Sequence, residues 1–465
     1  MKKYYTFFQH PFVFFFLVFL SLNLLSAVTF AQQPAGVEEG ILRIKVSEEL
    51  AAQIEAARMT RTSDNILMTG ITSLDNVSVQ FKVSALKRVF RHGGKFENKH
   101  RRYGLHRWYE IQMDKATPVL AALSAYGKID QVEIAEPVYK KAIVGSENSN
   151  FGPVVFDLKD AAPYATLPGA SNDPLLPNQW HYNNTSQTGG TVGSDIKLFQ
   201  AWGIETGSSD VIVAVTDGGI QVDHPDLVAN MWVNVNEIPG NGIDDDNNGY
   251  VDDINGYGFG DDTGEIAPDD HGTHVGGTVA ATTNNGVGVA GVAGGSGVGD
   301  GVRLMSCAAF GGTSNGGFAE TYVYGADMGA VISQNSWGYT IAGAFEQAVL
   351  DGIDYFIAEA GRDEFGNQVG PMNGGIVLVA AGNSNSNNLW YPGYYAPTVA
   401  VAGTTHNDTK AWYSNFGEWV DISAPGGETN NVAQQGVLST FANNQTVSIG
   451  TVRLIVLIIQ PIVPN

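Results

Sequence analysis

Two apolar runs, each leading into a polar residue beside glycine, constrain the fold of this chain more than any other feature. Val211–Ile220 has the sequence Val-Ile-Val-Ala-Val-Thr-Asp-Gly-Gly-Ile, and Gly375–Ser384 has Gly-Ile-Val-Leu-Val-Ala-Ala-Gly-Asn-Ser. Buried parallel strands have near-continuous apolar sequences, and α/β sheets place their sites at the carboxyl ends of such strands. The runs therefore predict a parallel sheet with Asp217 and Asn383 at its functional edge.

A segment of small residues between the two runs begins with a histidine. His271–Thr278 has the sequence His-Gly-Thr-His-Val-Gly-Gly-Thr, which predicts a helix whose glycines let neighbouring backbone come close. A lone histidine on a tightly packed helix is most often a structural residue of the core. The polar residues expected at the two strand ends favour a functional role for His271 instead.

The second part of the chain alternates between strand and helix patterns. Besides the two runs above, the sequence predicts strands at 303–307, 330–338 and 398–403, and helices at 194–202 and 318–328. Strands that alternate with helices indicate a parallel sheet with helices on both faces. We therefore predict an α/β fold for this part of the chain.

Residues 40–145 have the pattern of a smaller α+β domain. It contains three alternating strand patterns and two helix starts: strands at 41–46, 108–113 and 132–137, and helices that begin at Ser47 and Pro118. We find no catalytic constellation there, and the basic stretch 87–102 is most simply a solvated face. Residues 143–170, rich in Gly, Ser, Asn, Pro and Ala, predict an exposed linker.

The first 31 residues have the character of a secretory signal peptide. Lys2 and Lys3 supply positive charge, Phe12–Leu25 is a nearly unbroken apolar run, and Ala31 offers a small residue before a cleavage point. The alternative is a membrane anchor, but this run is shorter than the roughly 20 residues that a helix needs to span a bilayer. We expect an exported protein, secreted or at the cell surface, with no stable membrane span.

The charge of the chain is unevenly distributed. Residues 1–150 carry 19 Lys+Arg and 14 Asp+Glu, a net charge of +5, whereas residues 151–465 carry 6 and 33, a net charge of −27. Parts of opposite sign attract each other, and the acidic part favours cations over nucleic acid as partners. The only cysteine, Cys307, excludes an internal disulfide.

An acidic loop in the second part predicts a calcium site. The run Asp244-Asp-Asp-Asn-Asn-Gly-Tyr-Val-Asp-Asp253 places oxygen ligands at alternate positions, with glycine at the turn. Calcium takes six to eight such oxygens. The predicted ligands are Asp244, Asp246, Asn248 and Asp252. Asn255 stands where an EF-hand loop needs a bidentate glutamate, so the loop is not an EF-hand, and a solvated acidic turn is the alternative.

These segments resemble the subtilisin-like serine proteases, the subtilase family. The matching motifs, over roughly residues 172–426, are Asp217-Gly-Gly-Ile, His271-Gly-Thr-His, Asn335-Ser-Trp-Gly, Ala381-Gly-Asn383 and Ser423-Ala-Pro-Gly426. The family commonly has Asp-Thr-Gly at the first motif, whereas Gly218 stands here in place of the threonine. The resemblance implies a secreted endopeptidase with a subtilisin-like sheet, whose front domain is an inhibitory propeptide that assists folding and is then removed.

The resemblance also assigns roles to individual residues. His271 would be the general base that activates a serine, and Asp217 would orient its imidazole and stabilise the charged form. Asn383 would donate a hydrogen bond to the oxyanion, a contribution of about 3 kcal/mol. The substrate cleft would be lined by Ser336, Trp337 and Gly338, whose backbone pairs with an extended peptide. Taken singly, Asn383 would be a turn asparagine and Trp337 a core aromatic.

The sequence departs from the family where the nucleophile is expected. A subtilase carries Gly-Thr-Ser-Met-Ala soon after the Ser-Ala-Pro-Gly turn, but here Gly450-Thr451 is followed by Val452 and an apolar run, and no serine follows Ser448. A frameshift, a truncation and a true loss of the serine are the explanations that the sequence leaves open. We expect this chain to be inactive as written, either a broken endopeptidase or a non-catalytic relative that binds peptides.

The predicted organisation is therefore a signal peptide at 1–31, a propeptide with its linker at 32–165, a subtilase domain at 166–451 that is incomplete at its carboxyl end, and an aberrant apolar tail at 452–465. Its expected partners are a peptide or protein substrate and its own propeptide.

Overall fold

The computed structural model describes residues 35–144, 154–155, 171–310, 316–429, 432–443 and 445–449. The predicted signal peptide at 1–31 and the apolar tail at 452–465 lie outside these residues. None of the helices within the described ranges is both long enough and apolar enough to cross a membrane.

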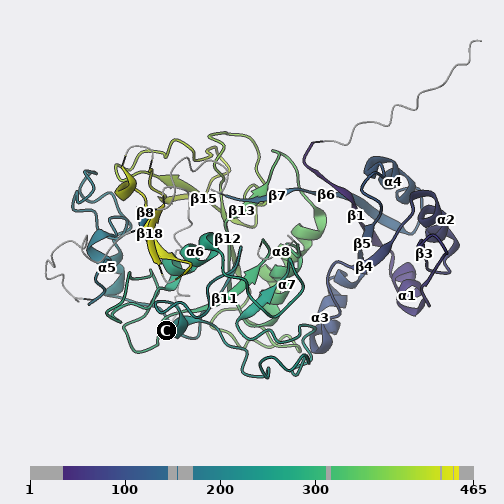
Figure 1. The fold of residues 1–465 in the computed structure, drawn as a ribbon, viewed down its shortest axis with the longest axis horizontal. Helices are drawn as coiled ribbons and strands as arrows, with labels where there is room; N and C mark the ends of the chain where they lie inside the picture. Colours follow the sequence, from purple (N-terminus) through teal and green to yellow (C-terminus); the bar gives the residue numbers. More distant parts are fainter. Residues whose placement is uncertain are drawn as a thin grey trace, which may run out of the picture. The chain divides into compact units, whose positions relative to one another are not determined.

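A seven-stranded parallel sheet forms the centre of the second part of the chain (Figure 1). Its strands, in spatial order, are β10 (Gly256–Gly258), β11 (Arg303–Ala308), β9 (Ile212–Asp217), β12 (Ile332–Asn335), β14 (Ile376–Ala380), β15 (Val399–Thr404) and β16 (Ile422–Pro425). The two apolar runs of the sequence form β9 and β14, and β12 lies between them. The predicted parallel α/β sheet is confirmed.

Helices cover both faces of this sheet because its strands are apolar on both sides. On β9, Val213 and Val215 pack in one buried cluster with α6 (Asp270–Ala280). Ala214 packs in another cluster, which contains residues of α7 (Glu320–Asp327) and α8 (Gln347–Glu359). Successive side chains of a strand point to opposite faces, so the two clusters lie on the two sides of the sheet.

One helix is shorter in the structure than the sequence predicted. The helix expected at 194–202 is α5 (Leu198–Trp202), because Lys197 has a left-handed backbone with a φ of 57°. The carboxylate of Asp195 accepts hydrogen bonds from the backbone N–H groups of Asn184 and Lys197, each at 2.8 Å. Such side-chain bonds compete with helical ones, and residues 194–197 are not helical.

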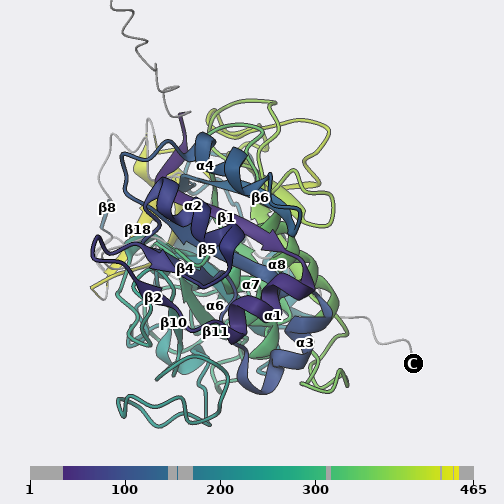
Figure 2. The ribbon, with the colours of Figure 1, turned by 90° about the vertical axis from the view of Figure 1, so that its right-hand side faces the viewer.

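The front domain has a four-stranded antiparallel sheet, which Figure 2 shows face-on. Its strands, in spatial order, are β4 (Ala85–Arg88), β5 (Trp108–Gln112), β1 (Val37–Val46) and β6 (Val132–Tyr139). Three helices pack on one face: α1 (Glu48–Ala56), α2 (Thr72–Phe81) and α4 (Val119–Tyr126). The predicted strands and helix starts are confirmed, and the Ser47 hydroxyl caps α1 by accepting the N–H of Leu50 at 3.2 Å.

The other face of this sheet is charged, because β1 alternates. Leu42 and Ile44 are fully buried beneath the helices, whereas Arg43 and Lys45 point to the opposite side. There the Nζ of Lys45 lies 2.7 Å from Oδ2 of Asp351 on α8. The front domain therefore meets the central domain through ion pairs of partly buried side chains.

A glutamate of the front domain caps α8. The carboxylate of Glu136 on β6 accepts the backbone N–H groups of Gln347 and Ala348, at 2.6 and 3.1 Å. Burial, together with the negative charge of Glu346, raises the pKa of Glu136 to about 7. A carboxylate at this position satisfies N–H groups that have no partner within the helix, so it stabilises the first turn of α8.

The basic stretch 87–102 is not the solvated face that its charge suggested. Lys99 on α3 (Glu97–Arg102) is fully buried, and its Nζ lies 3.2 Å from Oδ1 of Asp327 on α7. The Nε of Arg91 donates to Oε1 of Glu320 on the same helix at 2.7 Å. The prediction was wrong because both acidic partners lie more than two hundred positions away in the chain, where no local pattern reveals them.

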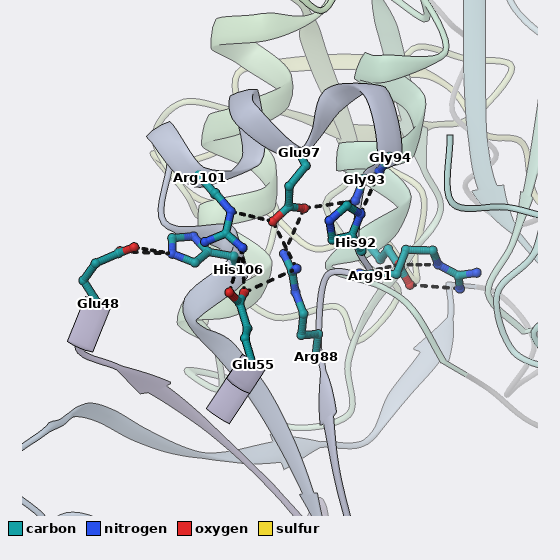
Figure 3. Close-up of polar contacts among 11 residues, drawn as sticks. Glu48, Glu55, Arg88, Arg91, His92, Gly93, Gly94, Glu97, Arg101 and His106 are labelled. Atoms are coloured by element: carbon teal, nitrogen blue, oxygen red, sulfur yellow. Dashed lines mark hydrogen bonds and ion pairs between the residues drawn. The ribbon is translucent and has the colours of Figure 1, made fainter. Parts of the chain in front are cut away.

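A second set of ion pairs lies on the side of α3 that faces α1 and β4 (Figure 3). Glu97 accepts a hydrogen bond from Arg88 at 3.1 Å and pairs with Arg101 at 2.9 Å, and Arg101 also pairs with Glu55 of α1 at 2.7 Å. Burial alone would raise the pKa of Glu97, but the hydrogen bond and charge of Arg88 hold it below its usual value. These pairs hold α3 within the front domain.

Candidate active site

Asp217 is the last residue of β9, at the carboxyl edge of the central sheet. It is 1 % exposed, and its Oδ1 accepts the backbone N–H of Gly218 at 2.7 Å. Gly219 follows with a φ of 118°, and a Cβ there would lie 2.4 Å from the carbonyl oxygen of Ala267. Only glycine allows the chain to turn sharply here, directly after the carboxylate.

His271 lies in the first turn of α6. The N-cap residue Asp269 accepts the backbone N–H groups of His271 and Gly272, each at 2.9 Å. The Nδ1 of His271 lies 2.8 and 2.9 Å from the two carboxylate oxygens of Asp217. Because a carboxylate can only accept, Nδ1 is the donor, and this contact fixes the orientation and the tautomer of the ring.

The glycines of both segments explain how helix and strand come so close. A Cβ on Gly218 would lie 2.3 Å from the carboxyl group of Asp269, and a Cβ on Gly272 would lie 2.4 Å from the carbonyl oxygen of Gly219. A threonine at position 218, the residue that the family resemblance suggests, would displace the capping aspartate. The departure at this position therefore has a local packing reason.

Asn383 lies just beyond β14, at the same edge of the sheet, and is half-buried. The Nδ2 of Asn415 donates to the carbonyl oxygen of Ala381 at 2.8 Å and so holds the turn that carries Asn383. The structure brings Asp217 and His271 into direct contact. It places Asn383 on a strand end that is separated from β9 by β12.

The segment Ser336–Gly338 presents its backbone rather than its aromatic side chain. The ring of Trp337 is fully buried, with its centroid 4.8 Å from that of Phe318, and its Nε1 donates to Oδ1 of Asn335 at 3.1 Å. The main chain forms β13 (Trp337–Tyr339), which pairs antiparallel with β7 (Lys141–Ile143) and lies beside it in Figure 1. Trp337 is thus a core aromatic whose strand also receives an extended segment.

That extended segment reaches the imidazole. The backbone N–H of Val144 donates to the carbonyl oxygen of Ser336 at 2.8 Å, and the carbonyl oxygen of Val144 lies 3.2 Å from Nε2 of His271. The sequence prediction assigned residues from 143 onward to an exposed linker and missed this contact. The apolar Ala-Ile-Val that ends at Val144 was the signal that could have revealed it.

The acidic loop gathers three carboxylates that could hold a cation. Glu237, Asp244 and Asp246 each place a carboxylate oxygen within 4.8 Å of the others. The side chain of Asp246 is 3 % exposed, its Oδ2 lies 3.0 Å from Nζ of Lys95, and its Oδ1 is buried without a hydrogen-bond partner. A buried unpaired oxygen among carboxylates fits a hard cation such as calcium.

Asn248 and Asp252, two of the predicted metal ligands, make hydrogen bonds within the loop. The amide of Asn248 donates to Asp253 at 3.0 Å, and the carboxylate of Asp252 accepts the backbone N–H of Asn241 at 3.1 Å. The group of carboxylates contains Asp244 and Asp246 of the predicted ligands but not Asp252. Glu237 was missed because it precedes the acidic run, and only the folded loop brings its carboxylate back to it.

Comparison with protein families agrees with this geometry. The model of the subtilase family, Peptidase_S8, matches residues 208–451, just over half of the chain. This chain belongs to the subtilase family. Subtilases are serine-type endopeptidases. The enzyme class predicted from the motifs is therefore confirmed at the level of the family.

Individual subtilases match different shares of the chain. Thermitase of Thermoactinomyces vulgaris is 32 % identical over 236 residues, which covers 50 % of this chain and 68 % of thermitase. The halolysin-like extracellular serine protease Nep of Natrialba magadii is 31 % identical over 272 residues, which covers 58 % of this chain and 41 % of Nep. The chain therefore spans less than half of Nep and about two thirds of thermitase.

A solved structure resembles most of the chain. Fervidolysin of Fervidobacterium pennivorans, a keratinolytic enzyme related to subtilisin, aligns with a TM-score of 0.51 and 20 % identity over 90 % of this chain and 50 % of that one. At this identity the likeness shows the fold alone.

Proposed function

We propose that this chain is the precursor of an exported subtilisin-like serine endopeptidase, in which residues from 32 to the linker act in cis as propeptide. The observation that carries the proposal is the path of the segment ending at Val144. It pairs with β13 as a bound peptide would, and its last carbonyl oxygen lies 3.2 Å from Nε2 of His271. An extended peptide that adds a strand to an exposed strand edge is a common mode of peptide recognition.

The proposed chemistry uses the contact between Asp217 and His271. The N–H of Nδ1 is donated to Asp217. The Nε2 of His271 is therefore the nitrogen that would take a proton from a serine hydroxyl and then give it to the leaving amine. Asp217 would stabilise the imidazolium that forms, and Asn383 would donate to the oxyanion. The position after Gly450-Thr451 holds Val452 instead of that serine, so we propose that the chain as written does not hydrolyse peptides.

The propeptide role follows from the same segment. If the carbonyl oxygen beside His271 belongs to the first processed bond, that bond is Val144–Gly145, at the start of the linker 143–170. The Lys45–Asp351 and Lys99–Asp327 pairs would hold the front domain over the cleft after the cut. Export is proposed from the signal-like residues 1–31, and names of relatives such as "Extracellular protease" of Xanthomonas campestris agree with it.

A non-catalytic subtilase that binds peptides is the second candidate. The observation that favours this candidate is Val452, which replaces the expected nucleophile. A cleft with the Asp217–His271 contact could still bind a peptide without a nucleophile.

Labelling with a fluorophosphonate separates these candidates. The chain as written should take up no label, because Val452 stands where the nucleophilic serine is expected. A chain with a serine helix restored after Thr451 should be labelled at one residue, and only after cleavage in the linker. Stoichiometric labelling of the chain as written would overturn the proposed inactivity, and absence of labelling in the restored, cleaved chain would favour the peptide-binding candidate.

We also propose that the acidic loop binds calcium. Glu237, Asp244 and Asp246 would supply carboxylate ligands, with the unpartnered Oδ1 of Asp246 among them. Burial and the charge of Asp246 raise the pKa of Glu237, as expected where carboxylates lie close together. A bound ion would supply charge compensation for the loop, and no catalytic step depends on it.

Calcium should raise the thermal unfolding midpoint of the full chain. Binding to the folded state alone adds about 2.7 kcal/mol at a hundredfold excess over Kd, and Asp246→Asn should remove this gain. Lys95→Met should tighten calcium binding in a calorimetric titration, because the ammonium 3.0 Å from Asp246 competes with the cation. The exposed Lys115→Met is the matched control. Equal midpoints in calcium and in chelator would contradict the proposal.

A further inference from the structure

We propose that the cleft contains a cation-selecting pocket in which Glu346 binds a lysine or arginine side chain at the fourth residue before the scissile bond of a substrate. This inference rests on the proposed peptide-binding function of the cleft. Glu346 precedes the first residue of α8 and is fully buried.

The register of the bound segment places Lys141 in this pocket. Ser336 pairs with Val144, Gly338 lies opposite Ala142, and Tyr339 lies opposite Lys141. Counted back from Val144, the residue whose carbonyl reaches His271, Lys141 is the fourth. A substrate that pairs with β13 in the same register would place its own fourth side chain at the same point, because strand pairing fixes which side chains share a position.

The walls of the pocket suit a long cationic side chain. The Nζ of Lys141 donates to Oε1 of Glu346 and, at 2.9 Å, to the carbonyl oxygen of Tyr139. It lies 5.1 and 5.0 Å from the ring centroids of Phe318 and Tyr339, within the range of cation–π attraction. The side chain of Lys141 is only 3 % exposed, so the pocket encloses the whole stem.

The charge of Glu346 requires a partner once the front domain has left. Within the described residues, the ion pairs of Glu346 are with Arg43 and Lys141, and both partners precede Val144 in the chain. Burial lowers the pKa of Lys141, and the carboxylate of Glu346 opposes that effect. Arg43 pairs with Oε2 of this carboxylate and Lys141 with Oε1. A ligand with a positive charge is therefore favoured in this apolar recess, since a neutral side chain would leave Oε1 without a cationic partner.

Peptide binding to the full chain tests this pocket. Ala142→Pro removes the N–H opposite Gly338 and should release the chain's own segment from the cleft. Fluorescein-labelled peptides of sequence Lys-X-Ala-Ile-Val are then titrated, where X is lysine, arginine or norleucine. We expect Kd values for lysine and arginine at least about tenfold lower than for norleucine, and a difference below about twofold in the Glu346→Gln background.

The possible outcomes distinguish failure of the proposed pocket from failure of the proposed peptide-binding cleft. Equal affinity of the lysine and norleucine peptides would overturn the pocket and leave the peptide-binding cleft intact. A preference for lysine that survives Glu346→Gln would overturn the role of Glu346. Failure of all three peptides to bind would overturn the proposed cleft together with the pocket.

A measurement on the chain with its own segment in place does not depend on Glu346→Gln folding. Lys141→Met should raise the hydrogen-exchange rate of the Val144 amide, which is bonded to Ser336, by about tenfold or more, whereas Lys141→Arg should keep it near the parent rate. Equal rates in the methionine and arginine variants would overturn the proposal.

Discussion

Asp217→Asn should lower kcat by about 10⁴-fold in a chain in which a serine has been restored after Thr451. This is the loss expected when the triad aspartate of a serine protease becomes an amide. In the structure, the Nδ1 of His271 donates to both carboxylate oxygens of Asp217, at 2.8 and 2.9 Å. An asparagine can present N–H to the ring, which would force Nδ1 to accept and would put the hydrogen on Nε2, where the base must be free of it.

Initial rates on a peptide substrate measure kcat and KM of the parent and of Asp217→Asn. KM should change little, because the substitution does not alter the backbone of the cleft. Asp223→Asn is the matched control, since Asp223 is an exposed aspartate just after β9. Its kcat should stay within about twofold of the parent. A loss smaller than tenfold in Asp217→Asn, or a comparable loss in the control, would show that the contact is not catalytic.

Asp327→Asn should destabilise the full chain by about 3–5 kcal/mol, because it leaves a buried ammonium without its nearest counter-charge. Lys99 is fully buried, 3.2 Å from Asp327 and 3.8 Å from Glu359. The same carboxylate lies 2.6 Å from Nε2 of His100 and accepts the hydroxyl of Tyr355. One substitution therefore disturbs three polar groups across the junction of α3 with α7 and α8.

Urea denaturation measures the free energy of unfolding, and a separate hydrogen-exchange measurement locates the effect in α3 and α7. Glu55→Gln is the matched control, because Glu55 pairs with Arg101 on the same helix α3 (Figure 3) but with side chains that are 31 % and 35 % exposed. It should change the free energy of unfolding by less than about 1 kcal/mol. Similar losses in both variants would mean that burial does not distinguish these pairs.

Strand ends were predictable from the sequence, because the signal that defines them is local. An apolar run followed by Asp-Gly-Gly or Gly-Asn specifies both a buried strand and the residue at its end. Asp217 and Asn383 accordingly lie at the sheet edge that the runs predicted. The small residues after His271 likewise predicted close packing, and Gly272 does contact the backbone of Gly219.

Contacts between distant segments were not predictable in this way. Lys99, Glu237 and Glu346 have ordinary sequence surroundings, and each acquires its role only from a partner that the fold brings to it. The charge asymmetry indicated that the front and back of the chain attract each other. It could not show that Lys99 would be buried, because burial depends on the position of Asp327 and Glu359 on two other helices.

The charged residues by which the front domain meets the central domain have a consequence for exchanging front domains between related proteins. Arg43, Lys45 and Lys99 each meet a carboxylate whose position is set by another domain. A front domain with neutral residues at these positions would remove a cationic partner from Glu346 or Asp327. One with acidic residues there would bring like charges together across the interface, which is strongly disfavoured. Substitutions on one side are therefore tolerated only with matching changes on the other, so the two parts of the chain must be inherited as a pair.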